Sequence, residues 1–245
     1  MIQKTLLLPS RLQFQSIRTL LLQSAFESVR IHRHSDADSG IFQINMDRPE
    51  AKNALGRDLL RGLQSSFEAI SAESAANVLM ICSSVSRVFC AGADLKERRT
   101  MSSSEARDFV NSLRSTFSSL GVFIEGATLG GGLEMALACD LRICGEDAKL
   151  ALPETGLAVI PGGWGTRLPR LIGKSIAKEL IYTGRKISPG DALSIGLINY
   201  CVPAGEAYSK ALEVAREINE KPATSLSTTL PNIVLMKLPV SPVEF

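Results

Sequence analysis

Two glutamates, Glu134 and Glu154, lie among small and apolar residues rather than within a charged stretch. A carboxyl group in apolar surroundings has a raised pKa, and this suits it to exchange protons near neutral pH. Two such groups could hold one water molecule or share one substrate proton. The structural alternative is that Glu134 caps its own helix and that Glu154 pairs with Arg167 or Arg170. Considered without their neighbours, the two residues favour that structural alternative.

Two small-residue loops could supply backbone donors to a ligand. Residues 126–134 read G-A-T-L-G-G-G-L-E and lead directly into a helix, so that free amides and the positive end of the helix dipole meet. Such a point favours an anion or a developing oxyanion. Residues 89–96 read F-C-A-G-A-D-L-K after a buried strand, and glycine there lets a ligand approach the backbone closely. The second loop alone is a weak signal, because similar loops often only turn the chain.

Four segments together resemble the crotonase family, also called the enoyl-CoA hydratase/isomerase group. In chain order they are D-R-P-E-A-K-N-A-L, F-C-A-G-A-D-L-K-E, I-E-G-A-T-L-G-G-G-L-E-M-A-L-A-C-D-L-R-I and L-P-E-T-G-L-A-V-I-P-G-G. The resemblance extends from about Val29 to Lys221. Four linked motifs in the family's order make chance agreement improbable.

The resemblance implies a site and a reaction. The amides of Ala93 and Gly131 would form an oxyanion hole, with Glu134 and Glu154 as the acid/base pair. The implied coenzyme-binding residues are Ala51, Ala93, Asp94, Leu95, Lys96 and Gly131. The implied reaction hydrates 2-enoyl-CoA thioesters to 3-hydroxyacyl-CoA in fatty-acid or branched-chain amino-acid catabolism. It needs no cofactor, since coenzyme A is part of the substrate.

Alternatives remain open at this stage. Within the family, an enoyl-CoA isomerase or an acyl-CoA hydrolase would use the same oxyanion hole with different carboxylates. One relative binds RNA, and Lys96, Arg98 and Arg99 form a small basic cluster here. Contact with solvent or with coenzyme phosphates explains that cluster better, and we expect no RNA partner. A catalytically impaired isoform is the third alternative.

The sequence departs from the family in three places. A core strand is missing before Ile124, which indicates an internal deletion, and Trp164 stands where the family prefers a small residue. After Lys221, a proline-broken tail replaces the C-terminal helices. The family forms homotrimers or hexamers, and those helices build the interface between the subunits of the trimer. Their replacement argues against that assembly here.

Hydrophobic periodicity predicts an α/β fold with largely parallel strands, and the resemblance makes it a crotonase-like spiral of repeated ββα units with a reduced C-terminal helical part. In the strand 42–46, apolar residues alternate with polar ones, which predicts one buried face. Strands are also expected at 78–82, 122–124, 141–144 and 197–202. Helices are expected at 56–72, 104–119 with Ser104 as N-cap, 133–138, 175–182, 189–194 and 205–219.

Composition limits the remaining possibilities. A formal charge of +2 and scattered basic residues give no field that would favour nucleic acid. The two histidines and five unpaired-looking cysteines predict no metal site, and no apolar run is long enough to span a membrane. Residues 1–26 contain no acidic side chain, which is typical of a mitochondrial transit peptide, although a plastid signal has a similar composition. We therefore expect a leader at 1–26, a crotonase-like domain at 27–221, a poorly ordered Pro/Ser/Thr-rich tail at 222–245, and a mitochondrial location.

Overall fold

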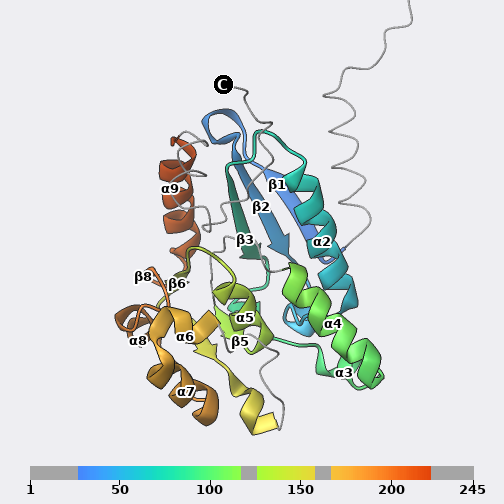
Figure 1. The fold of residues 1–245 in the computed structure, drawn as a ribbon. Helices are drawn as coiled ribbons and strands as arrows, with labels where there is room; N and C mark the ends of the chain where they lie inside the picture. The colour runs from blue at the N-terminus through green and yellow to red at the C-terminus, as the bar shows by residue number, and fades with distance from the viewer. Residues whose placement is uncertain (1–26, 117–125, 158–166, 222–245) are drawn as a thin grey trace, which may run out of the picture.

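The computed structural model describes residues 27–116, 126–157 and 167–221 (Figure 1). The expected leader 1–26, the expected strand 122–124, Trp164 and the expected tail 222–245 lie outside the described residues. The described strands and helices alternate along the chain, as an α/β fold requires.

The first sheet has three strands. β1 (Val29–Arg33) pairs antiparallel with β2 (Ile41–Met46), and β2 pairs parallel with β3 (Val78–Ser83). The connection from β2 to β3 contains α2 (Arg57–Ser71), because a parallel pair needs a long crossover. Short 3-10 turns lie at η1 (Asp36–Asp38) and η2 (Pro49–Ala51).

Both faces of this sheet are covered, which corrects the expectation of a solvated polar face on β2. Phe42, Ile44 and Met46 pack on the α2 side, but Ile41 of β2 and Val78 and Met80 of β3 pack against α9 (Ala207–Asn219). Figure 1 shows α2 and α9 on opposite sides of the three strands. Gln43 is therefore only 8% exposed, and its Oε1 accepts a hydrogen bond from the Tyr208 hydroxyl of α9 at 3.1 Å.

A second sheet carries the loops of interest. β4 (Val88–Cys90), β5 (Ala127–Leu129) and β7 (Lys149–Ala151) are parallel in the order β4-β5-β7. The chain leaves β4 toward α3 (Leu95–Arg98) and α4 (Ser103–Thr116), leaves β5 into α5 (Gly131–Leu137), and leaves β7 into η3 (Pro153–Leu157). Because parallel strands end at the same edge, these three exits lie together.

The remaining elements follow around that sheet. β6 (Ile143–Gly145) and β8 (Tyr200–Val202) form a parallel pair. The last helices before α9 are α6 (Arg167–Ile172), α7 (Lys174–Thr183) and α8 (Pro189–Ser194). All pairings among the described strands except β1 with β2 are parallel, as expected from the sequence.

Several expected boundaries were wrong, among them the starts of two strands and of one helix. The expected strand 197–202 begins only at Tyr200, because the amides of Leu197 and Ile198 bond instead to the Ala192 carbonyl of α8. The expected strand 141–144 lies at Ile143–Gly145. Ser102 rather than Ser104 caps α4: its hydroxyl accepts the Glu105 amide at 3.3 Å, and the Glu105 carboxylate accepts the Ser102 amide at 2.8 Å.

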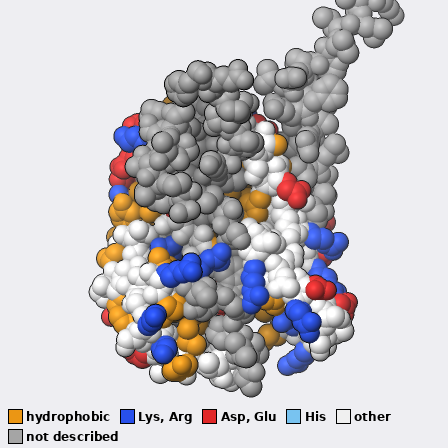
Figure 2. All heavy atoms as spheres, in the orientation of Figure 1, with side chains coloured by type: hydrophobic (Ala, Val, Ile, Leu, Met, Phe, Trp, Pro, Cys, Tyr) orange, Lys and Arg blue, Asp and Glu red, His pale blue; other side chains and the backbone are white. Residues whose placement is uncertain are grey.

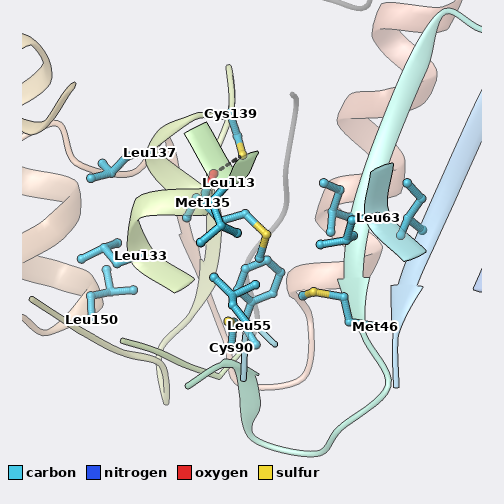
Figure 3. Packing of buried hydrophobic residues seen from close by; sticks show 14 of the residues in the cluster. Met46, Leu55, Leu63, Cys90, Leu113, Leu133, Met135, Leu137, Cys139 and Leu150 are labelled. Atoms are coloured by element: carbon cyan, nitrogen blue, oxygen red, sulfur yellow. Dashed lines mark hydrogen bonds between the residues drawn. The ribbon is translucent and has the colours of Figure 1, made fainter. Parts of the chain in front are cut away.

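One large hydrophobic cluster joins the two sheets. Figure 3 shows Leu55, Cys90 and Met135 packed close together, with Met46 and Leu63 of the first sheet and its helix nearby. All five are buried. Leu55 belongs to the loop before α2, and Met135 to α5, so this cluster fixes that loop against the second sheet.

Candidate active site

The loops that follow β4, β5 and β7 bring the predicted residues to one edge of the second sheet. Ala93 follows β4, Gly131 follows β5, and Glu154 follows β7. A cavity of about 900 Å³ lies at the opposite edge, lined by Arg87, Ala127 and Lys149 among others. We place the candidate site at the first edge, because free backbone donors and the carboxyl groups of Glu134 and Glu154 converge there.

The amide of Ala93 points away from Leu55, its partner in a parallel β-bridge. Leu55 donates its amide to the Gly92 carbonyl at 2.7 Å and accepts the Asp94 amide at 3.1 Å. In such a parallel bridge, the residue between the two bonded ones directs its own N–H to the other side. Among the described residues the Ala93 amide has no acceptor.

Gly131 lies on that other side. A β-carbon placed on Gly131 would lie 3.7 Å from the Ala93 amide nitrogen, and one placed on Gly92 would lie 3.3 Å from the Gly131 amide nitrogen. Gly131 opens α5, where the first amides have no acceptor within the helix, and none of the described residues accepts its proton. The two amides thus lie close together, as two donors to one ligand oxygen must.

Glycine is required at two points of this junction. Gly92 has φ +94°, and a β-carbon there would lie 2.8 Å from the Leu129 carbonyl oxygen. A β-carbon on Gly132 would lie 2.5 Å from the Cys90 carbonyl oxygen. The start of α5 therefore packs directly on the backbone of β4, which holds the two amides close together.

The two glutamates lie on either side of the start of α5. Glu134 is in its first turn and is 5% exposed, with its amide donating to the Gly130 carbonyl at 3.0 Å. Glu154 reaches the same turn from η3, because a β-carbon on Gly130 would lie 3.0 Å from Glu154 Oε1. Oε1 of Glu134 and Oε2 of Glu154 are buried and have no hydrogen-bond partner among the described residues.

Burial raises the pKa of both carboxyl groups. The pKa of Glu134 rises from 4.5 to about 8, first through burial and then through the charge of Glu154, with Arg114 and Arg167 opposing. Burial also raises the pKa of Glu154. Near neutral pH Glu134 can therefore hold a proton beside a second carboxyl group, and a proton-exchanging pair needs such a donor.

Two parts of the structural alternative for the glutamates are absent from the described contacts. Glu134 makes no side-chain cap to α5, and no ion pair joins Glu154 to Arg170 among the described contacts. Arg167 contributes charge near Glu134.

The two predicted coenzyme-binding stretches lie side by side. The Ala91 amide donates to the Lys52 carbonyl at 3.0 Å, so that the loop containing Ala51 runs along the loop 91–96. Leu95 and Lys96 are exposed at this surface. The carboxylate of Asp94, in contrast, is 8% exposed and turned inward.

Asp94 has a positional function that its place in the motif does not reveal. Its Oδ1 accepts the amides of Lys96 and Glu97 at 3.1 Å each, so it caps α3, and its Oδ2 pairs with Arg48 at 2.9 Å. These bonds outweigh burial and lower the pKa of Asp94. The sequence-based reasoning missed Arg48 and also Asn53, although both belong to the first motif.

The small basic cluster is partly used inside the protein. Arg98 donates to the Ala106 carbonyl at 3.2 Å and lies 5.8 Å from the centre of the Phe109 ring. Figure 2 shows Lys and Arg side chains dispersed over one face and interrupted by other residue types, without a continuous stripe.

The described residues contain neither a metal-binding cluster of side chains nor a membrane-spanning helix. No group of three or more His, Cys, Asp and Glu side chains among them is placed to hold a metal ion. Within the same residues, no helix is long and apolar enough to cross a membrane. The five cysteines are free thiols.

Solved structures share this fold. The chain superposes on the enoyl-CoA hydratase from Bacillus anthracis with a TM-score of 0.76 at 39% identity, covering 81% of this chain and 79% of that one. It superposes on Pseudomonas aeruginosa DspI with a TM-score of 0.77 at 31% identity, covering 83% and 85%. The expected α/β crotonase-like fold is thereby confirmed.

Proteins with similar sequences carry hydratase names as well. The chain is 57% identical over 216 residues to the Arabidopsis thaliana protein named probable enoyl-CoA hydratase 2, mitochondrial, covering 84% of this chain and 72% of that one. It is 42% identical over 203 residues to the Mus musculus methylglutaconyl-CoA hydratase, mitochondrial, covering 78% of this chain but only 65% of that one. Their mitochondrial labels agree with the location expected from the leader.

A family model described as enoyl-CoA hydratase/isomerase matches residues 36–235, which is more than half of the chain and includes all four motifs. The sequence resemblance, the fold and the relatives therefore lead to one conclusion: the chain belongs to the enoyl-CoA hydratase/isomerase family.

Proposed function

We propose that this protein adds water across the 2,3 double bond of a 2-enoyl-CoA thioester and forms a 3-hydroxyacyl-CoA. The observation that supports the proposal is the meeting of two free amides with the buried Glu134 and the half-buried Glu154 at the start of α5. Ala93 and Gly131 lie close together, and this supports a shared contact with one thioester oxygen. Glu134 and Glu154 each keep one oxygen without a partner among the described residues.

In this mechanism the amides of Ala93 and Gly131 bind the thioester oxygen and draw electron density from the conjugated double bond. The water oxygen bonds to C3, and the electron pair of the double bond moves to form an enolate whose oxygen the amides stabilise. One carboxylate removes a proton from the water, and the partner carboxyl protonates C2. The proton gained by one glutamate equals the proton lost by the other, so the pair can exchange with solvent between turnovers.

The reaction requires no redox cofactor, because water addition leaves the overall oxidation level unchanged. Coenzyme A enters as part of the substrate. We expect it to lie along the surface made by Ala51, Ala93, Leu95 and Lys96, with Asp94 holding the loop from within. The exposed Lys96 ammonium suits a phosphate of that ligand.

The isomerase is the second candidate, because the family model includes it. An isomerase moves one proton from C2 to C4 and can work with one carboxylate. Two carboxylates at the same helix start favour water addition instead. Incubation with a 3-enoyl thioester, with the 2-enoyl product measured, separates the two reactions.

One relative is named methylglutaconyl-CoA hydratase, and this name supports a proposal for the substrate class. We propose a short or branched 2-enoyl-CoA from fatty-acid or branched-chain amino-acid breakdown in the mitochondrion. A fluorescent fusion of the full chain should enter mitochondria, and a fusion without residues 1–26 should remain outside them.

The direct test is water addition by the purified full chain to crotonyl-CoA and to 3-methylglutaconyl-CoA. The loss of the conjugated enoyl absorbance measures the reaction. Oxygen-18 from labelled water should appear at C3 of the product. If the folded protein hydrates neither thioester, the hydratase assignment is wrong and the catalytically impaired isoform remains as the alternative. Size-exclusion chromatography of the same sample measures whether it forms the family's trimer.

A further inference from the structure

Asn53 is a fully buried polar residue in the loop before α2, and the mechanism above does not use it. It is 0% exposed and has φ +52°, as does Lys52 before it. Asparagine tolerates this left-handed conformation better than most side chains do, although the conformation remains costly. A buried, strained polar residue persists only where its surroundings hold it firmly.

The side chain of Asn53 joins three separate segments. Its Oδ1 accepts the Arg48 amide at 2.8 Å. Its Nδ2 donates to the Ser83 hydroxyl at the end of β3 at 2.8 Å and to the Phe89 carbonyl of β4 at 3.0 Å. The last two partners are 30 and 36 residues away along the chain. Asn53 thus fixes the loop 48–55 against the strand that precedes the oxyanion loop.

Leu55 transmits this position to the oxyanion loop. It lies two residues after Asn53 and bonds to the residues on both sides of Ala93, at 2.7 Å and 3.1 Å. The direction of the Ala93 amide is set by these two bonds, since it must point away from Leu55. A displacement of the loop 53–55 would therefore turn the amide away from the point that it shares with Gly131.

Arg48 forms a second tie between the same two loops. Its guanidinium donates to the Ala54 carbonyl at 3.0 Å and pairs with Asp94 at 2.9 Å. Its backbone amide is the one that Asn53 accepts. Gly92 and Asp94, on either side of Ala93, are thus held by a network of which Asn53 is the buried centre.

We propose that Asn53 is a positioning residue that aims the Ala93 amide at the thioester oxygen, with Arg48 as its partner. The inference rests on the proposed oxyanion hole. The inference adds that polarisation of the thioester carbonyl by the oxyanion hole depends on a side chain that touches neither the substrate nor the attacking water. If the Ala93 amide no longer points at the thioester oxygen, the carbonyl should be less polarised and the reaction slower. Binding of the coenzyme portion should change little.

The test uses the full chain and two readouts. Butyryl-CoA labelled with carbon-13 at C1 is an unreactive thioester, and the infrared stretch of its carbonyl moves to lower frequency when donors polarise it. Asn53→Ala should show a smaller frequency shift than the wild type, a kcat for crotonyl-CoA at least about 10-fold lower, and a butyryl-CoA Kd within about threefold of wild type.

Matched controls separate positioning from general stability. Asn77 also makes a side-chain bond between distant segments, to Asn219 at 2.9 Å, but it lies at the start of β3 next to α9. Asn77→Ala should keep the wild-type carbonyl shift and kcat. Should Asn53→Ala fail to fold, Arg48→Met tests the same network, with Arg30→Met at the exposed Arg30–Asp47 pair as its control.

The two proposals fail in different ways. A wild-type carbonyl shift and kcat in folded Asn53→Ala, or in Arg48→Met if that variant replaces it, would overturn the positioning role. A wild-type protein that shifts the butyryl-CoA carbonyl but hydrates no enoyl-CoA would overturn the hydratase, while a reduced shift in the variant would still support positioning. No shift in the wild type would overturn both.

Discussion

Glu154 lies against the helix turn that carries Glu134. Its Oε1 would be 3.0 Å from a β-carbon on Gly130, and the Gly130 carbonyl accepts the Glu134 amide at 3.0 Å. The two residues are 20 positions apart in the sequence and come from a helix and a separate 3-10 turn. Their proximity contributes to the raised pKa of Glu134, after burial.

Removal of either carboxyl group should stop hydration without preventing thioester binding. Glu134→Gln and Glu154→Gln keep the side-chain shape but cannot exchange a proton, and such groups typically contribute 10²-fold or more to a rate, so kcat should fall by about 100-fold at least. The Kd for butyryl-CoA should change by less than about threefold, because the amides of Ala93 and Gly131 remain. Turnover at the wild-type rate in both variants would remove these residues from the mechanism.

The raised pKa of Glu134 predicts a pH-dependent stability. The folded state keeps the proton up to about pH 8, whereas the unfolded chain loses it near 4.5. The folded state therefore binds more protons between these values, and the free energy of unfolding should decrease as pH rises, by at most about 1.4 kcal/mol per pH unit. Glu134→Gln should flatten this slope and become more stable relative to wild type at pH 8 than at pH 5. Urea unfolding across that range measures both slopes, and parallel curves would contradict the assignment.

The close approach of α5 to β4 predicts that Gly132 tolerates no side chain. In Gly132→Ala the new β-carbon would lie 2.5 Å from the Cys90 carbonyl oxygen, so α5 must move or the protein must lose stability. We expect a destabilisation of about 1–3 kcal/mol and a reduced kcat, because Gly131 moves with the helix. Gly190→Ala is the control: Gly190 is also helical, but a β-carbon there has no neighbour within 4 Å. Its stability and kcat should match wild type within about 0.5 kcal/mol and about twofold.

The capping box at α4 predicts a loss of stability without a loss of chemistry. Ser102→Ala removes the hydroxyl that accepts the Glu105 amide, and this should lower the free energy of unfolding by about 1 kcal/mol. The kcat for crotonyl-CoA should be unchanged, since Ser102 and Glu105 lie outside the site. Thermal unfolding and steady-state kinetics on the same sample check both statements. A fall in kcat would indicate that α4 contributes to the site.

Much of this protein could be predicted from its residues alone. Alternating and continuous apolar runs gave the strands β2 and β3 and the helix α2, because burial of one or both faces follows directly from periodicity. The glycines of 126–132 indicated amides at a helix start, since few other residues permit such close backbone approach. The four motifs then supplied the family and the four residues that the structure brings to one edge.

Tertiary structure decided the rest, because it depends on contacts between distant segments. Local pattern could not show that α9 covers the polar face of β2, that the Asp94 carboxylate turns inward to Arg48, or that Asn53 joins Ser83 to Phe89. The pKa of Glu134 likewise depends on burial and on a carboxylate 20 residues away. The sequence by itself determined which groups could do the chemistry. Only the packing of β4, α5 and η3 decided that these groups meet, because the direction of a side chain depends on the neighbours that block its other orientations.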